Sequence, residues 1–160
     1  MSKIKTSDNF ETIPFMDFYG FRGYDEMRDV VEKLQKIPGF KFRLLQCGDG
    51  WDIHHDGGLD YTEETYISRE LLDSMIEKCD NFYGKESSWI RFDFSYTLNG
   101  RNGWFSFDNS NSCKSLQNCC KRAEEKGECF YDDWKAGIEK TPEQRWDECL
   151  QNLQPFINCD

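Results

Sequence analysis

Apolar residues recur along the chain at helical spacing in several segments, each bounded by polar or turn-forming residues. The segments cover 25–36, a stretch that begins at about Glu63 or Ser68 and ends at Cys79, 112–126, and 141–153. The last has the clearest beginning, because Thr141 suits the N-cap, Pro142 the first helical position and Gln144 the third position of a capping box. Its expected buried stripe is Trp146, Leu150 and Leu153.

Strict alternation of apolar and polar residues predicts strands between these helices. The predicted strands are 40–44, a short return strand from Trp51 to Ile53, 91–98 and 104–107. Residues 99–103 are rich in Asn and Gly, which favours a hairpin loop. Strands joined by tight turns predict an α+β fold, with an antiparallel sheet of about four strands and three to four helices packed mainly on one face. We expect one domain over 1–160, with 1–23 as an extended N-terminal arm.

The composition supports a folded protein of the reducing cytosol. Aromatic residues make up 16% of the 160 residues, and large rings fill a core with few side chains. Neither a signal-peptide pattern nor an apolar run of membrane-spanning length is present, which predicts a cytoplasmic protein without a membrane anchor. Without an export signal, the eight cysteines are expected to be free thiols rather than disulfides. A structural zinc site is the next alternative, and the absence of a C-x-x-C pair disfavours it.

Negative charge is concentrated in one region. The net charge is −10, yet residues 1–50 carry eight basic and eight acidic side chains. Between Asp49 and Asp80 the chain has ten carboxylates against only Arg69 and Lys78. Such a field repels phosphate, so direct binding of DNA or RNA is disfavoured, whereas a basic protein partner or a cation is favoured.

We therefore expect a non-catalytic protein-binding module that docks on a basic protein through this acidic region. The expected docking residues are Asp49, Trp51, Asp56, Asp60, Tyr61, Glu63, Glu70, Asp73, Glu77 and Asp80. Inhibitors, immunity proteins and anti-defence proteins of this physical class occupy nucleic-acid-binding clefts by mimicking nucleic acid. The plainer alternative is that the carboxylates of the predicted helix 63–80 (Glu63, Glu70, Asp73, Glu77 and Asp80) form an ordinary solvated face.

The loop 52–63 resembles the calcium loop of an EF-hand and supports a second hypothesis. Asp52, Asp56, Asp60 and Glu63 occupy positions one, five, nine and twelve of that loop, and Gly57 occupies the sixth. The pattern departs from the motif at its third position, which is His54, and the preceding segment is predicted as strand and turn. Two hypotheses therefore remain for this loop: calcium binding by these four carboxylates, or a solvated acidic loop without a metal.

Catalytic motifs are weak in this chain. His54 and His55 are the only histidines, so any histidine-dependent activity would use this loop, and Cys47 is a conceivable nucleophile beside them. The sequence contains no nucleophile elbow and no phosphate-binding glycine loop. A non-catalytic protein is favoured over a small enzyme whose pocket lacks a sequence signature.

Overall fold

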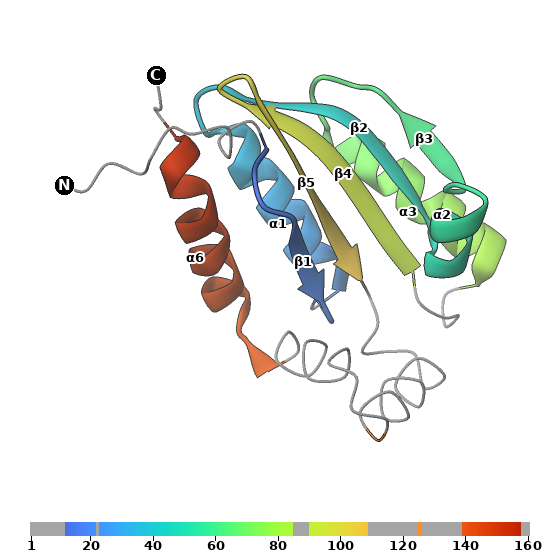
Figure 1. Ribbon diagram of the computed structural model, residues 1–160. Helices are drawn as coiled ribbons and strands as arrows, with labels where there is room; N and C mark the ends of the chain where they lie inside the picture. Colours follow the sequence, from blue (N-terminus) through green and yellow to red (C-terminus); the bar gives the residue numbers. More distant parts are fainter. Residues whose placement is uncertain (1–11, 22, 85–89, 109–124, 126–138, 158–160) are drawn as a thin grey trace.

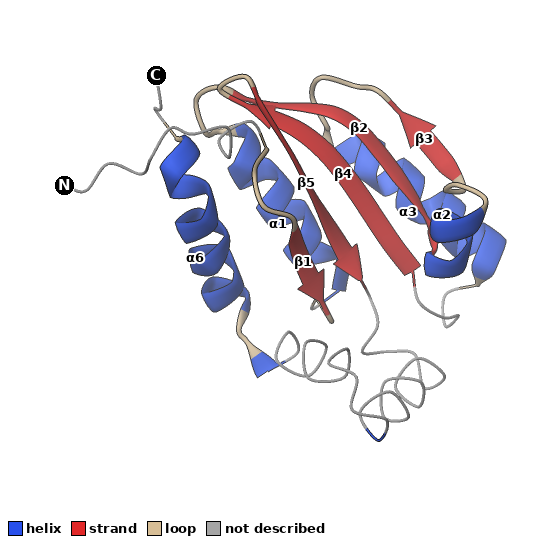
Figure 2. Ribbon diagram, viewed as in Figure 1, coloured by secondary structure: helices blue, strands red, loops and turns tan. Residues whose placement is uncertain are grey.

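The chain forms a five-stranded mixed sheet with helices behind one of its faces (Figures 1 and 2). The computed structural model describes residues 12–21, 23–84, 90–108, 125 and 139–157. The strands are β1 (Met16–Tyr19), β2 (Phe40–Asp49), β3 (Asp60–Thr62), β4 (Ile90–Leu98) and β5 (Arg101–Asp108), in the order β1-β5-β4-β2-β3. The described helices are α1 (Gly23–Gln35), α2 (Gly50–His55), α3 (Arg69–Tyr83), α6 (Pro142–Leu153) and the 3₁₀ helix η3 (Gln154–Phe156).

The predicted α+β class is confirmed, with one strand more than expected. The additional strand is β1, which pairs in parallel with β5, whereas the other neighbouring strands are antiparallel. β1 lies within the segment that was expected to be an extended arm. Its Met16 and Phe18 are buried, so this segment completes the sheet and contributes to the core.

Two helices, α3 and α6, begin where local signals predicted, although α3 ends at Tyr83, beyond the predicted Cys79. Ser68 is the N-cap of α3 and its hydroxyl accepts a hydrogen bond from Leu71 N (3.0 Å). Thr141 and Gln144 form the reciprocal capping box at the start of α6. Such bonds satisfy backbone N–H groups that have no partner inside the helix, which is why they define its first residue. The predicted helix 112–126 falls almost wholly outside the described residues.

The β4–β5 hairpin has a tighter turn than the expected loop. Asn99 and Gly100 both have positive φ (52° and 82°), as a two-residue type I′ turn requires, and pairing resumes at Arg101. Gly103, on β5, faces Tyr96 of β4, and a Cβ at position 103 would lie only 2.5 Å from the Tyr96 ring. The glycine therefore makes room for a buried aromatic side chain.

Two local predictions were wrong. Residues 51–53 are not a return strand, because Asp49 caps the helix α2 there: Asp49 Oδ1 accepts a hydrogen bond from Trp51 N (2.7 Å). The strand that returns antiparallel to β2 is β3 instead. The buried side of α6 is also displaced from the predicted stripe. Its buried residues are Arg145, Cys149 and Leu153, whereas Trp146 and Leu150 are only partly buried.

The core lies between the sheet and the helices and consists largely of aromatic rings. Phe94 and Phe105 stack face to face across β4 and β5, with ring centroids 4.7 Å apart. On the same side of the sheet, Cys47 and Cys79 are buried free thiols, as is Cys149 on α6. The free-thiol prediction is thus confirmed for these cysteines, and the other five lie outside the described residues.

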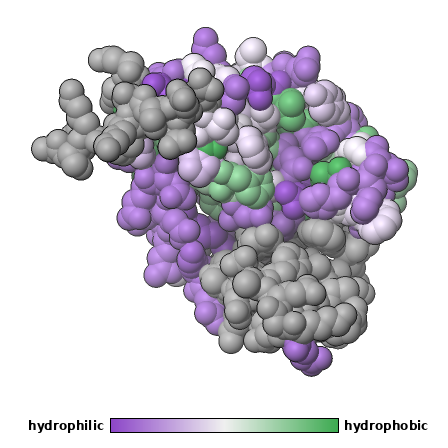
Figure 3. All heavy atoms as spheres, viewed as in Figure 1, coloured by the Kyte–Doolittle hydropathy of each residue, from purple (hydrophilic) through white to green (hydrophobic). Residues whose placement is uncertain are grey.

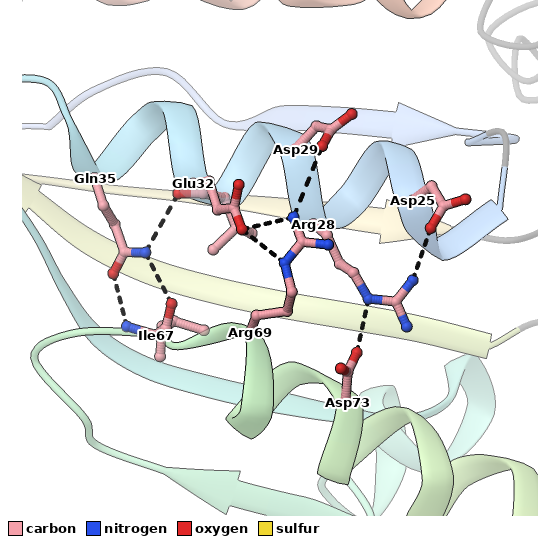
Figure 4. A network of polar contacts seen from close by, with 9 residues as sticks. Asp25, Arg28, Asp29, Glu32, Gln35, Ile67, Arg69 and Asp73 are labelled. Carbon is pink, nitrogen blue, oxygen red and sulfur yellow. Dashed lines mark hydrogen bonds and ion pairs between the residues drawn. The ribbon is translucent and has the colours of Figure 1, made fainter.

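A network of ion pairs and hydrogen bonds holds α3 against α1 (Figure 4). Arg28 Nε donates to Asp73 Oδ1 (2.7 Å), and Arg69 pairs with Glu32 (2.6 Å) in the opposite direction. Gln35 closes the network, because its amide bonds both the N–H and the C=O of Ile67 (2.6 and 2.9 Å). None of the helices described here is both long and apolar enough to cross a membrane.

Candidate docking surface

The structure brings α2, the beginning of β3 and the end of α3 together at one corner of the molecule (Figure 1). Tyr83 on α3 donates from its hydroxyl to Asp52 Oδ2 on α2 (2.6 Å). Burial, followed by this hydrogen bond, raises the pKa of Tyr83 to about 12. A neutral phenol therefore ties the short helix α2 to the end of α3.

The beginning of β3 is attached to α3 by an ion pair. Lys78 Nζ donates to Asp60 Oδ2 (2.5 Å), while Asp60 Oδ1 accepts a hydrogen bond from Tyr61 N (2.8 Å). The hydrogen bond from Lys78 lowers the pKa of Asp60, which is therefore ionised in neutral solution. Around this pair lies an open hollow of about 460 Å³, lined by Leu59, Asp60, Lys78, Asn81 and Phe82.

Large aromatic side chains stand exposed at this corner. Trp51 on α2 is 62% exposed and Phe82 on α3 is 67% exposed. The Trp51 ring packs on His55, with centroids 3.8 Å apart, and Phe82 packs edge-on against Tyr83. We call the surface made by α2, Leu59, Asp60, Lys78, Asn81 and Phe82 the α2–α3 corner. Exposed rings beside ionised carboxylates are the chemistry of a protein-binding surface.

The carboxylates expected to form one docking face are divided among several environments. Asp49 caps α2, Asp73 pairs with Arg28, and Asp80 is half-buried on α3. Four carboxylates are exposed and make no ion pair within the described part of the chain: Glu70 and Glu77 on α3, and Asp56 and Glu63. The charges of these four residues are available to a partner.

Asp60 and Tyr61, both expected in one docking site, point to opposite faces of the sheet. Successive side chains of a strand alternate between its faces. In the pairing of β2 with β3, Asp60 lies opposite the buried Cys47, and its side chain reaches Lys78 on α3. Tyr61 lies opposite Gln46, whose side chain bonds Asp93 on the other face of the sheet. Tyr61 is 56% exposed and therefore belongs to a different surface from Phe82.

That other face of the sheet has a polar cluster that the sequence analysis did not single out. Arg91 Nε donates to Asp93 Oδ1 (2.7 Å) and Arg91 Nη2 donates to Ser106 Oγ (2.9 Å). A hollow of about 490 Å³ lies over this cluster, with Phe15 and Trp104 in its lining. Figure 3, seen toward this face, shows mainly hydrophilic residues around small hydrophobic areas. Its only sequence signal is the alternation of Arg91, Asp93 and Ser95 along a predicted strand.

The residues proposed for calcium do not share one loop. Asp52 lies within α2 and bonds Tyr83, Asp56 is the C-cap of α2, and Asp60 is in β3 and bonds Lys78. Among the described residues, no three His, Cys, Asp or Glu side chains converge as metal ligands would. Calcium binding remains a prediction that would require Asp52 and Asp60 to leave these partners.

The candidate catalytic groups are also separated. His55 is exposed and stacked on Trp51, whereas the Cys47 thiol is fully buried and its Sγ lies 3.9 Å from the carbonyl oxygen of Met75. A hydrogen bond with Cys79, together with burial, raises the pKa of Cys47, which disfavours the nucleophilic thiolate. Among the residues that the structure describes, Cys47 and His55 therefore do not form a reactive cysteine–histidine pair.

Comparison with known proteins identifies no relative of this chain. No protein-family model matches it, and no curated protein or solved structure matches it either. Functional inference therefore depends on the chemistry of the surfaces described above.

Proposed function

We propose that this protein is a non-catalytic binding module that docks on a basic protein through the α2–α3 corner. The observation that carries the proposal is the pairing of Trp51 and Phe82, both exposed by more than half, with a region of strong negative charge. Aromatic side chains provide large contact area at low entropic cost, and they are enriched among the residues that dominate binding energy. Charge complementarity then steers the partner to the surface.

The charge of this region indicates which partners it accepts. The segment from Asp49 to Asp80 contains ten carboxylates and only two basic residues, and Lys78 and Arg69 are each already paired with a carboxylate. Arg28 of α1 neutralises one further member of the segment, Asp73. A basic surface that normally binds nucleic acid is complementary to this arrangement. A protein that covers such a surface would act as an inhibitor, an immunity protein or an anti-defence protein, which is the biological role we assign to the module.

Site-specific photo-crosslinking in the native cell would test this proposal. A photoreactive phenylalanine analogue placed at position 51 or 82 should cross-link a partner with a basic surface. The matched control is position 104, because Trp104 is also a large exposed ring (45%) but lies on the open face of the sheet. The cross-linked protein would be identified by mass spectrometry and produced in pure form.

Binding to the purified partner would then be measured as a function of salt. We expect the affinity to fall by about tenfold or more between about 50 and 300 mM salt, because screening weakens a contact steered by charge. Trp51→Ala and Phe82→Ala should weaken binding, while Trp104→Ala should not. Equal cross-linking at position 104, or an association that salt does not change, would contradict the proposal.

A further inference from the structure

The hollow of the α2–α3 corner combines three kinds of group around one small volume. Asp60 supplies a carboxylate, Phe82 an exposed aromatic ring and Asn81 an amide, within about 460 Å³. A carboxylate accepts hydrogen bonds from a cation, an aromatic face attracts a cation through its quadrupole, and an apolar wall such as Leu59 accommodates an aliphatic stem. Together these groups suit a long basic side chain.

The chain itself already places a basic side chain in this hollow. Lys78 lines it, and the ammonium group donates to Asp60 Oδ2 (2.5 Å). The side chain of Lys78 is 56% exposed, so the pair is partly solvated and contributes little to stability. An incoming cation can therefore take the place of Lys78 without disturbing the fold.

Arginine fits the hollow better than lysine does. A guanidinium is planar, is less strongly hydrated than an ammonium, and can stack on an aromatic ring while it donates several hydrogen bonds in its plane. Within the described ranges, Asp60 Oδ1 accepts a hydrogen bond from one backbone N–H, that of Tyr61, and Oδ2 accepts one from Lys78. Both oxygens therefore retain acceptor capacity for a two-point contact with a guanidinium.

We infer that this hollow is the specific anchor for an arginine side chain of the partner, and that Lys78 occupies the anchor in the free protein. The inference rests on the proposed function, since it names the partner residue that the α2–α3 corner would bind. Lys78 then competes with the partner, so its removal should strengthen binding even though it lies in the binding site.

A small probe tests the anchor without the partner. N-acetylarginine amide would be titrated into ¹⁵N-labelled full-length protein and followed by NMR. We expect saturable shifts of the amide signals of residues 59, 60, 78, 81 and 82. The control ligand is N-acetylcitrulline amide, which has nearly the same shape but no charge. No saturable shift with the arginine probe, or equal shifts with citrulline, would overturn the inference.

Variants of the protein separate the groups in the hollow. Asp60→Asn and Phe82→Leu should weaken binding of the arginine probe, each by about three- to tenfold, because one removes the carboxylate and the other the ring. Lys78→Met should strengthen it by about three- to tenfold, since the internal competitor is gone. The matched control is Glu70→Gln, which removes one exposed carboxylate of α3 outside the hollow and should change little.

These outcomes distinguish the anchor from the broader proposal. If Lys78→Met weakens binding of the probe or leaves it unchanged, the competition by Lys78 is refuted. If the arginine probe does not bind, but the partner still cross-links at position 51 and its binding responds to salt, the docking surface stands and only the arginine anchor fails. If the probe binds as expected but no partner cross-links at positions 51 or 82, the proposed function fails while the hollow remains an arginine site.

Discussion

The ion pair between Arg145 and Glu26 provides the most direct test of how this fold is stabilised. Arg145 on α6 donates from Nε to Glu26 Oε2 (2.8 Å) and from Nη2 to Glu26 Oε1 (2.9 Å), and Nη2 also lies 3.3 Å from the carbonyl oxygen of Gly20. The two side chains are only 4% and 3% exposed. The pair therefore joins α6 to α1 inside the protein, where neither charge can be hydrated.

Removing one member of the pair should lower the stability of the protein strongly, because the other charged side chain stays buried without this ion pair. Arg145→Met removes the charge from a side chain of similar length, and we expect it to lower the free energy of unfolding by about 3–5 kcal/mol. That is a large share of the roughly 5–15 kcal/mol that stabilises a typical domain. If Arg145→Met does not fold, Glu26→Gln keeps the shape of the partner and provides a milder substitution.

The double variant Glu26→Met/Arg145→Met should be more stable than Arg145→Met alone, because it also removes the buried carboxylate that has lost its ion pair with Arg145. Urea unfolding followed by circular dichroism would give the free energy of each variant. The control is Lys140→Met, which breaks the exposed pair of Lys140 with Glu148 and should cost only about 0–1 kcal/mol. If Arg145→Met costs no more than the control, the buried pair does not have the importance assigned to it.

Three further substitutions test other parts of the structure. Tyr96→Phe should raise the free energy of unfolding by about 1 kcal/mol, because the buried Tyr96 hydroxyl has no hydrogen-bond partner among the described residues; a loss of stability in urea would refute this. Gly103→Ala should lower it by about 1–3 kcal/mol, since the new methyl group would overlap the Tyr96 ring, and a neutral effect would show that the ring moves aside. The third concerns alkaline pH: the folded pKa of Tyr83, about 12, lies above its ordinary value of 10.0, so its contribution to stability is present below pH 10.0 and is lost as the pH rises toward 12. Tyr83→Phe should flatten the decline of stability in that interval, and an unchanged slope in urea titrations would argue against a raised pKa of Tyr83 in the folded protein.

Local sequence signals predicted the parts of this fold that depend on near neighbours. The capping box at Thr141 and the apolar period of α3 involve residues a few positions apart, and both match the structure. The Asn and Gly residues of 99–103 also indicated the hairpin, although only Asn99 and Gly100 form its turn and residues 101–103 belong to β5. Local signals failed at 51–53, where a short apolar pattern fits either a strand or a helix, and a single cap at Asp49 favours the helix.

The position of the candidate site was only partly predictable. The acidity of 49–80 and the aromatic residues Trp51 and Tyr61 are visible in the sequence, and they direct attention to the segment that contributes to the α2–α3 corner. Sequence alone did not indicate that Phe82 would stand exposed beside Asp60, because a residue of that type on an amphipathic helix is more often buried. It also placed Tyr61 with Asp60, although the register of β2 and β3 sends them to opposite faces.

The chain's class, its charge distribution and most of its helices and strands follow from local preference and periodicity, which a sequence contains in full. Contacts between distant residues do not follow in this way. The parallel pairing of β1 with β5, the pair of Glu26 with Arg145, and the meeting of Lys78 with Asp60 each depend on how the elements pack. Packing decides which charges are neutralised inside the molecule and which remain for a partner, and this is why only the tertiary structure brings Phe82, Lys78 and Asp60 together in the candidate site.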